Sequence, residues 1–594
     1  MSERTNGQRS GGQRPEGQRP DGHDQADQDG GSGAEAVSAA APMETLLSRA
    51  GSGAVTRWLP GREGVRFAAA LARRPVPLAR EVAGTAFELG KVLVGASDVA
   101  PERKDRRFAD PAWTGNPVLR RVMQAYLATA GAAERVVEGA ELDWATDERI
   151  RFLTENLVEA LAPSNNPLIN PAAWKAVIDT GGANLARGTR ALVKDMASAP
   201  RIPQMVEPDA KVPGRDLAMT PGRVVFRAPL LELIQYAPTT DRVGTVPLLI
   251  VPPTINKYYV VDLAPGRSLV EHLVGSGQQV FAISWRNPPK EAAGWGLDEY
   301  ATAVLDALDA VEAISGSPRT TLLALCSGGI LTSMLAAHLA ATGGLDRVAA
   351  LSLLVTVLDQ AQAGTTGALM DERAAEAATA RSAREGYLDG AALAEVFAWL
   401  RPRDLVWNYW VNNYLLGAPP PAFDILSWNA DTTRMTAALH RDFIDLARDN
   451  ALTVPGAATL LGTPVDLSAV TVDSYVVAGI ADHLCPWQNC WSTQRLLGGD
   501  TRFVLSTSGH IAAIVNPPGN KKASFQVGPG DGTDVPADAE AWLAAAEEHE
   551  GSWWEDYASW LADHAGPQRD APTALGGPDH PPLDPAPGTY VFAT

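Results

Sequence analysis

The spacing of hydrophobic residues changes along the chain and predicts two kinds of structure in turn. Between about residues 43 and 205, apolar positions recur with helical periodicity, as in the run 147–161, and predict a helical N-terminal domain. From about residue 206, short apolar runs alternate with helical stretches, which predicts a mostly parallel sheet covered by helices. The strand candidates are residues 223–227, 231–236, 247–251, 278–284, 320–325 and 348–354.

A second change of pattern predicts an insertion within this α/β region. Residues 358–465 combine Ala-rich helical sequence with the tryptophan-rich run 407–417, and they divide the core into residues 206–357 and 466–565. We interpret the insertion as a cap over the strand ends. Its large aromatic side chains either bind an oily substrate or pack between cap and core, and the sequence leaves both open.

The two ends of the chain have compositions unlike those of packed domains. Residues 1–42 are mostly Gly, Gln, Arg, Asp and Ala, and Gly-Gln-Arg recurs at Gly7, Gly12 and Gly17. Such a segment cannot offset the entropy lost on ordering, so we expect it to be disordered. Residues 566–594 are rich in Pro, Gly and Asp, and we expect an irregular tail.

The most informative chemical feature is a cysteine that ends an apolar run. Residues 321–325 have a strand pattern, Cys326-Ser327-Gly328-Gly329 follow, and a helical pattern continues to residue 341. Strand, sharp turn and helix form the nucleophile elbow of α/β-hydrolases, where glycines leave room around a strained turn. We therefore expect Cys326 to be a nucleophile, with the Ser327 N–H as half of an oxyanion hole. The alternative is a buried structural cysteine at a strand end.

An acidic residue and a histidine follow in the chain order of that fold. Residues 472–480 have the pattern of a late core strand with Asp482 just beyond it, and His510 follows the last strand candidate, 502–505. Because loops at strand ends carry the chemistry of open α/β sheets, we predict that both groups act with Cys326. His483 is the competing histidine, and we interpret it as structural.

The second oxyanion donor is expected in the loop after residues 247–251. The backbone N–H of Thr254 is the candidate, because in this fold a loop after an early core strand supplies that donor. Pro252 and Pro253 equally suit a loop whose only role is conformational constraint.

Composition narrows the choice of partners and compartment. The chain has 594 residues, and 50 Lys and Arg against 69 Asp and Glu give a net charge of −19, so we expect no nucleic-acid partner. Three cysteines indicate a reducing compartment. Cys485 and Cys490 form a structural pair or are free thiols, and without nearby ligands they predict no metal site. The sequence has no pattern of a leader or transmembrane segment, so we expect a cytoplasmic protein.

Several strings of residues together resemble one known family, the polyhydroxyalkanoate synthases, which polymerise intracellular polyester. The resemblance covers roughly residue 100 to the end, and the length of the chain suits the single-polypeptide type of this family better than the shorter type that needs a second subunit. It implies an α/β-hydrolase core with a cap subdomain behind a helical N-terminal domain. The strings are the elbow itself and residues 106–113, 251–259, 284–288, 479–487, 508–518 and 587–591.

The resemblance also implies a reaction and its partners. The substrates would be a 3-hydroxyacyl-CoA and a growing polyester chain, with no cofactor, and Cys326 activated by His510 would carry the acyl group. The family assigns the residue matching Asp482 to deprotonation of the incoming hydroxyl, and orientation of His510 is the alternative role. The family further implies a homodimer on the surface of cytoplasmic polyester granules.

Other functions fit the same residues. A thioesterase or polyester depolymerase would share the fold, since the fold does not select water or alcohol as the acyl acceptor, and a granule-coating protein would need no catalysis. Lys257, Arg267 and Arg286 are candidate contacts for CoA phosphates, with structural pairing as the alternative. No motif specifies the monomer's side-chain length, because a pocket distinguishes one methylene by only about 1–3 kcal/mol.

Overall fold

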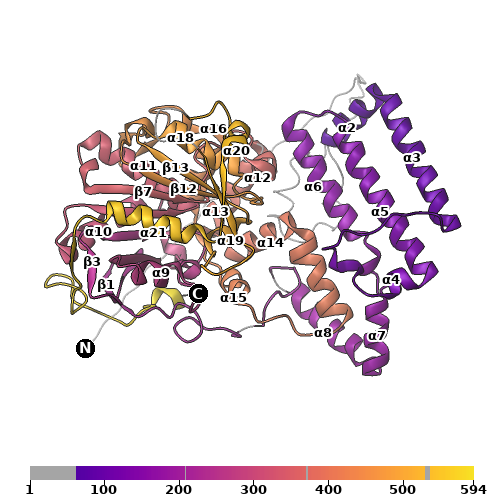
Figure 1. Ribbon diagram of the computed structural model, residues 1–594, viewed down its shortest axis with the longest axis horizontal. Coiled ribbons are helices and arrows are strands. Elements are labelled where there is room, and N and C mark those ends of the chain that lie inside the picture. The colour runs from indigo at the N-terminus through magenta and orange to yellow at the C-terminus, as the bar shows by residue number, and fades with distance from the viewer. Residues whose placement is uncertain (1–61, 198, 208, 370–371, 529–534, 594) are drawn as a thin grey trace, which may run out of the picture. The chain divides into compact units, whose positions relative to one another are not determined.

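The computed structural model describes residues 62–197, 199–207, 209–369, 372–528 and 535–593 (Figure 1). The predicted disordered segment 1–42 lies outside these residues. Residues 43–61 of the predicted helical domain also lie outside. The first described elements are helices, which confirms the helical prediction for the described part of residues 43–205. They are α2 (Arg62–Arg73), α3 (Pro75–Val94), α4 (Ala112–Gly115), α5 (Pro117–Glu138), α6 (Trp144–Ala160), α7 (Pro171–Thr180) and α8 (Ala183–Ala197).

Local sequence signals explain where these helices begin and end. α5 starts at Pro117, and the Asn116 side chain accepts hydrogen bonds from two amides of its first turn. α7 is capped in the same way by Asn170 and ends at Gly181, whose φ of 58° favours glycine. Of the helices in the described ranges, none is long and apolar enough to cross a membrane.

A single ten-stranded sheet forms the centre of the α/β region, in the order β1-β2-β5-β4-β6-β7-β12-β13-β14-β15. The strands from β5 to β13 in this order pair in parallel, as the alternating pattern predicts. The outer pairs are antiparallel. The strands are β1 (Gly222–Arg227), β2 (Leu231–Tyr236), β4 (Leu248–Val251), β5 (Val280–Trp285), β6 (Thr320–Leu325), β7 (Val348–Leu354), β12 (Ser474–Gly479), β13 (Thr501–Ser506), β14 (Ser524–Val527) and β15 (Glu547–Glu550).

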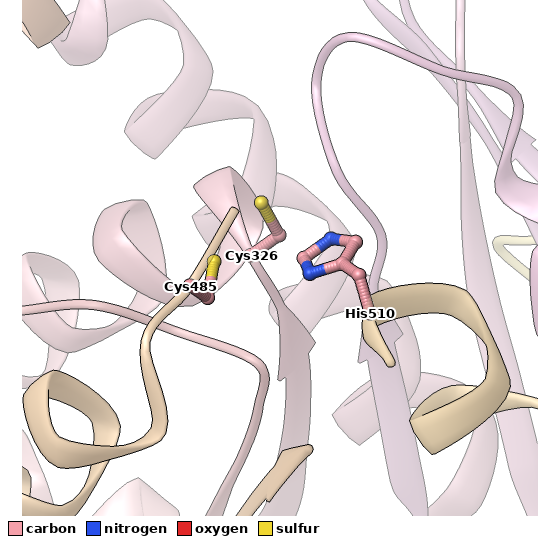
Figure 2. Close-up of side chains that lie close together, drawn as sticks. All are labelled: Cys326, Cys485 and His510. Carbon is pink, nitrogen blue, oxygen red and sulfur yellow. The ribbon is translucent and has the colours of Figure 1, made fainter. Parts of the chain in front are cut away.

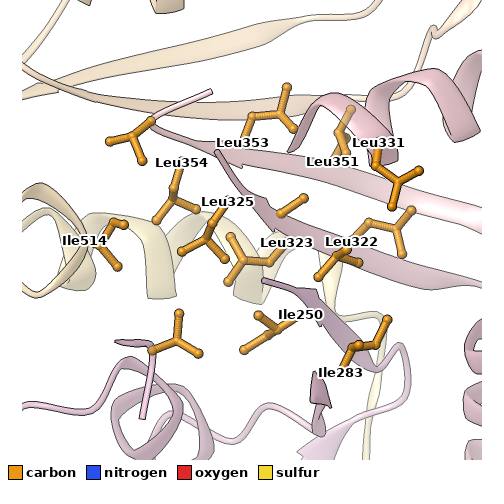
Figure 3. Close-up of a cluster of buried hydrophobic side chains, with 14 of the residues drawn as sticks. Ile250, Ile283, Leu322, Leu323, Leu325, Leu331, Leu351, Leu353, Leu354 and Ile514 are labelled. Atoms are coloured by element: carbon orange, nitrogen blue, oxygen red, sulfur yellow. The ribbon is translucent and has the colours of Figure 1, made fainter. Parts of the chain in front are cut away.

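The central strands are buried on both faces. All four residues of β4 and all six of β6 are buried, the burial expected of parallel strands between layers of helices. Figure 3 shows leucines of β6 and β7 gathered with Ile250, Ile283 and Leu331. Each such side chain contributes about 1.5–3 kcal/mol when fully buried, so this cluster fixes the position of the β6 end. The helices next to these strands are α9 (Leu269–Gly275), α10 (Leu297–Ser315), α11 (Ser327–Thr342) and α21 (Trp553–His564).

The predicted insertion lies between β7 and β12 in the chain. It is mainly helical, with two π-helical turns, η7 (Arg403–Trp407) and η8 (Trp410–Leu415), in its tryptophan-rich part. The other elements are α12 (Gly364–Leu369), α13 (Glu372–Glu385), β8 (Tyr387–Leu388), α14 (Gly390–Leu400), α15 (Asp424–Ala430), β9 (Met435–Thr436), α16 (Ala437–Asp449), β10 (Thr459–Leu460) and β11 (Thr463–Pro464).

The aromatic run of the insertion packs against the N-terminal helical region. The Trp410 indole N–H donates to the Asn165 carbonyl at 3.1 Å, and the Tyr414 hydroxyl donates to Asp195 at 2.8 Å. Successive rings between Trp399 and Tyr414 meet edge to face. Of the two alternatives for these side chains, their contacts support packing, with the helical region as the partner.

The tail predicted to be irregular is tied to the sheet. β16 (Gln568–Asp570) pairs with the short strand β3 (Arg242–Gly244). The buried carboxylate of Glu232 on β2 accepts hydrogen bonds from the Thr589 and Tyr590 amides, both at 2.9 Å. The sequence missed this strand because a short edge strand has no pattern of its own.

Candidate active site

Cys326 lies on a sharp turn between β6 and α11. Its backbone has φ of 49° and ψ of −119°, a conformation that strains any residue with a Cβ. A Cβ at Gly328 would lie 2.5 Å from the Pro252 carbonyl oxygen, and one at Gly329 would lie 2.0 Å from Thr356 Oγ1. The turn therefore requires both glycines, and it lifts the partly exposed thiol above the strand end.

His510 and Asp482 come from the loops after two other parallel strands of the sheet, β13 and β12. His510 is the first residue of α19 (His510–Ile514), and its Nδ1 lies 2.7 Å from Asp482 Oδ2. The other oxygen, Oδ1, accepts the Leu484 and Cys485 amides, both at 2.9 Å. The carboxylate is therefore held on both sides, and it orients the imidazole so that Nε2 serves the nucleophile.

The structure adds Cys485 to the site, whereas the sequence analysis considered this residue only as part of a structural pair or as a free thiol. Figure 2 shows Cys326 between the Cys485 thiol and the His510 ring. The two sulfur atoms and a ring nitrogen of His510 lie within 4.8 Å of one another. Cys485 reaches the site because its own amide binds Asp482. Its position three residues after Asp482 was the available signal, and all three cysteines of the chain are free.

The electrostatics of the site favour a thiolate paired with an imidazolium. The hydrogen bond from Cys485, and then the contact with His510, hold the pKa of Cys326 well below its usual range against the effect of burial. Burial lowers the pKa of His510, but the charge and hydrogen bond of Asp482 outweigh it and raise the pKa to about 10. The hydrogen bond to Cys326, together with burial, raises the pKa of the Cys485 thiol. Cys485 is therefore a neutral donor to the thiolate.

The two predicted oxyanion donors are close to each other. The Thr254 amide donates to Ser327 Oγ at 3.0 Å, and the hydroxyls of the two residues lie 3.1 Å apart. The Thr254 N–H is thus directed at a side chain in this arrangement. The Ser327 amide contributes to lowering the pKa of the Cys326 thiol. The oxyanion roles of both amides stay predictions.

His483, the competing histidine, differs from His510 in its surroundings. Burial, with a smaller effect of the Arg401 charge, lowers the pKa of His483 to about 4, so this ring is neutral. Its Nδ1 has no hydrogen-bond partner within the described part of the chain. With Asp482 it lines a pocket of about 630 Å³. The structural interpretation of His483 stays a prediction.

The candidate contacts for CoA phosphates all have protein partners. Lys257 Nζ donates to the Ala593 carbonyl at 2.7 Å, and Arg267 pairs with Asp424 at 2.5 Å. The Arg286 guanidinium lies 5.5 Å from the centre of the Tyr590 ring. These contacts support structural pairing, the alternative that the sequence left open.

Comparison with known proteins defines the class of the site-bearing region. Residues 247–517 match the family model described as alpha/beta hydrolase fold. A solved esterase from Thermogutta terrifontis aligns with 50% of this chain and 93% of its own at 14% identity, with a TM-score of 0.29. The family match and the observed sheet confirm an α/β-hydrolase core.

A narrower family matches both regions of the chain. Residues 104–273 match the N-terminus of poly-beta-hydroxybutyrate polymerase. Poly(3-hydroxyalkanoate) polymerase 1 of Ectopseudomonas oleovorans is 47% identical over 87% of this chain and 92% of the relative. The polymerase subunit of Cupriavidus necator is 40% identical, over 84% and 85%. The chain belongs to the poly(3-hydroxyalkanoate) polymerases and is an acyltransferase of polyester synthesis.

Proposed function

We propose that this polymerase joins 3-hydroxyacyl groups from CoA thioesters through an acyl-enzyme on Cys326, releasing CoA at each addition. The single observation that carries the proposal is the contact of Cys326 with His510 on a strained elbow, with Asp482 behind the histidine. A thiolate suits this chemistry, because an acyl group held as a thioester stays activated for the next transfer.

The first half-reaction loads the enzyme. The Cys326 thiolate attacks the thioester carbonyl, and the developing oxyanion accepts hydrogen bonds from backbone amides of the elbow. The carbon–sulfur bond to CoA then breaks. The His510 imidazolium gives its proton to the departing CoA sulfur, which leaves the acyl group on Cys326 and a neutral His510.

The second half-reaction extends the polymer. Neutral His510 accepts the proton of a 3-hydroxyl, the oxygen attacks the Cys326 thioester, and the thiolate departs to restore the thiolate–imidazolium pair. We assign Asp482 to orienting His510, because Oδ2 holds Nδ1 and Oδ1 is occupied by two amides. Direct deprotonation of the hydroxyl by Asp482 is the competing assignment.

Purified full-length protein given a 3-hydroxyacyl-CoA tests the proposal. We expect CoA release in step with insoluble polyester, and a mass increase of one acyl group on the peptide that contains Cys326. Cys326→Ala should abolish both, whereas Cys490→Ala, at a buried cysteine outside the site, should keep both. Soluble hydroxy acid as the sole product would instead establish a hydrolase.

A rapid-mixing experiment on Asp482→Asn separates its two roles. If Asp482 orients His510, the first release of CoA slows together with later turnovers, because the imidazole loses its position and charge. A burst of CoA release as fast as that of the unmodified enzyme, followed by failed elongation, would assign Asp482 to the hydroxyl instead.

The partners and location follow from the same proposal. A growing polyester is hydrophobic and separates from water, so we infer that the enzyme works at the surface of a cytoplasmic granule, as a homodimer. The polymerase family membership supports this inference. Co-sedimentation with polyester granules and light scattering of the purified protein test its two parts.

A further inference from the structure

Cys326, Cys485 and His510 form a cluster that the reaction does not fully use. Their sulfur and nitrogen atoms lie within 4.8 Å of one another. In the described residues this is the one cluster of at least three His, Cys, Asp or Glu side chains with such spacing. The reaction requires the pair of Cys326 and His510, whereas Cys485 contributes only a hydrogen bond to the thiolate.

We propose that the cluster binds a Zn²⁺ ion and that this ion reversibly inactivates the polymerase by holding its nucleophile. Thiolate and imidazole are the ligands that zinc prefers, and two sulfurs with one nitrogen leave a fourth position for water. Ligand atoms of a tetrahedral zinc site lie about 3.5 to 3.8 Å apart. The three ligand atoms of the cluster lie within 4.8 Å of one another, which is near that spacing.

The hydrogen bonds around the cluster suit a metal ligand. Asp482 Oδ2 lies 2.7 Å from His510 Nδ1, so the free electron pair for a metal is on Nε2, on the side of the two sulfurs. A carboxylate that orients a histidine in this way is the usual partner of a zinc-binding imidazole. Asp482 is itself held by two amides, which keeps the ligand in place.

The chemistry of the ligand set also suits a divalent ion. When Zn²⁺ binds, its ligands are two thiolates and a neutral imidazole, and any protons that these three groups carry are released to solvent. The two thiolate charges then offset the charge of the ion.

The sequence predicted no metal here because Cys485 has no ligand near it along the chain. The other two ligands come from positions far away in sequence, at the ends of β6 and β13. Cys490, five residues after Cys485, is also buried, but it lies outside the cluster. It therefore provides a matched control for any change made at Cys485.

Cobalt absorption tests binding independently of activity. Full-length protein without an affinity tag is titrated with Co²⁺, which reports tetrahedral geometry and thiolate ligation through its visible and near-ultraviolet bands. We expect Cys485→Ser to lose about half of the thiolate band. It should also weaken zinc affinity more than 100-fold, because loss of a ligand's hydrogen-bond partner alone costs about 10- to 100-fold. Cys490→Ser should match the unmodified protein.

Inhibition is measured separately, as CoA release with and without buffered Zn²⁺. We expect zinc to abolish CoA release in the unmodified enzyme and in Cys490→Ser, and a chelator to restore it. Inhibition of Cys485→Ser should require at least 100-fold more free zinc. This readout rests on the proposed function, whereas the cobalt spectra do not. Absent thiolate bands, or equal metal affinity in Cys485→Ser, would overturn the metal site. If the thiolate bands are present but zinc does not inhibit, the proposed effect of the ion on catalysis is overturned. If the metal-free enzyme releases no CoA, that result counts against the proposed reaction only.

Discussion

The strained backbone of Cys326 predicts that removing its Cβ stabilises the protein. At φ of 49° and ψ of −119°, a non-glycine residue costs about 1–3 kcal/mol. Glycine relieves this strain but loses roughly 0.5–1 kcal/mol through the greater freedom of the unfolded chain. We therefore expect Cys326→Gly to be more stable than Cys326→Ala, by up to about 2.5 kcal/mol.

The comparison between these two variants isolates the backbone. Both lack the thiol, so both lose the ion pair with His510 and all nucleophilic activity, and their electrostatic differences cancel. Cys490 lies in the helix α17 (Trp487–Trp491) and supplies the reverse case. Cys490→Gly should be less stable than Cys490→Ala by about 0.5–1 kcal/mol.

Urea unfolding followed by tryptophan fluorescence measures the four variants under identical conditions. We expect the difference in free energy of unfolding between the Gly and the Ala variant to be positive at position 326 and negative at position 490. If Cys326→Gly is no more stable than Cys326→Ala, while the Cys490 pair behaves as a helix requires, then the elbow is not strained and the reasoning fails.

Three further predictions concern ionisation and packing. Because the pKa of Cys326 is depressed and that of His510 is raised to about 10, the rate of alkylation of Cys326 by iodoacetamide should be almost constant between pH 6 and 9. A rise of this rate centred near the ordinary thiol pKa of about 8.5 would refute the ion pair. Burial lowers the pKa of His440 to about 4, so the unfolded chain binds the proton first and the free energy of unfolding falls by roughly 3 kcal/mol as the pH drops from about 6.5 to 4. Acid unfolding of His440→Gln should lack this loss, and an acid profile equal to that of the unmodified protein would contradict the prediction. Gly84→Ala in α3, where an added Cβ meets nothing within 4 Å, should raise the melting temperature, whereas Gly329→Ala should lower it because of Thr356; equal shifts would show that packing at the elbow is loose.

The order of elements and most of the site could be predicted because they depend on local pattern and chain order. The strand candidate 320–325 matches β6 residue for residue. Cys326, Asp482 and His510 follow the parallel strands β6, β12 and β13, and parallel strands bring the residues at their carboxyl ends to one edge of a sheet. Their meeting is therefore a consequence of topology, and topology is what the alternating pattern encodes.

Features that depend on contacts between distant residues could not be predicted. The position of Cys485 beside Cys326 depends on the turn that its amide forms with Asp482. The packing partner of the aromatic run is the loop at Asn165, more than two hundred residues earlier. Neither hydrophobic periodicity nor composition contains such pairings, because both are read along one segment at a time.

The anchoring of Lys257 has a practical consequence for protein engineering. This lysine lies in the loop that carries Thr254 to the elbow, and its buried ammonium depends on a carbonyl oxygen of Ala593. A truncation that removes Ala593 would leave that cation without this acceptor and loosen the wall behind the nucleophile. Shortened versions of the protein should therefore keep Ala593.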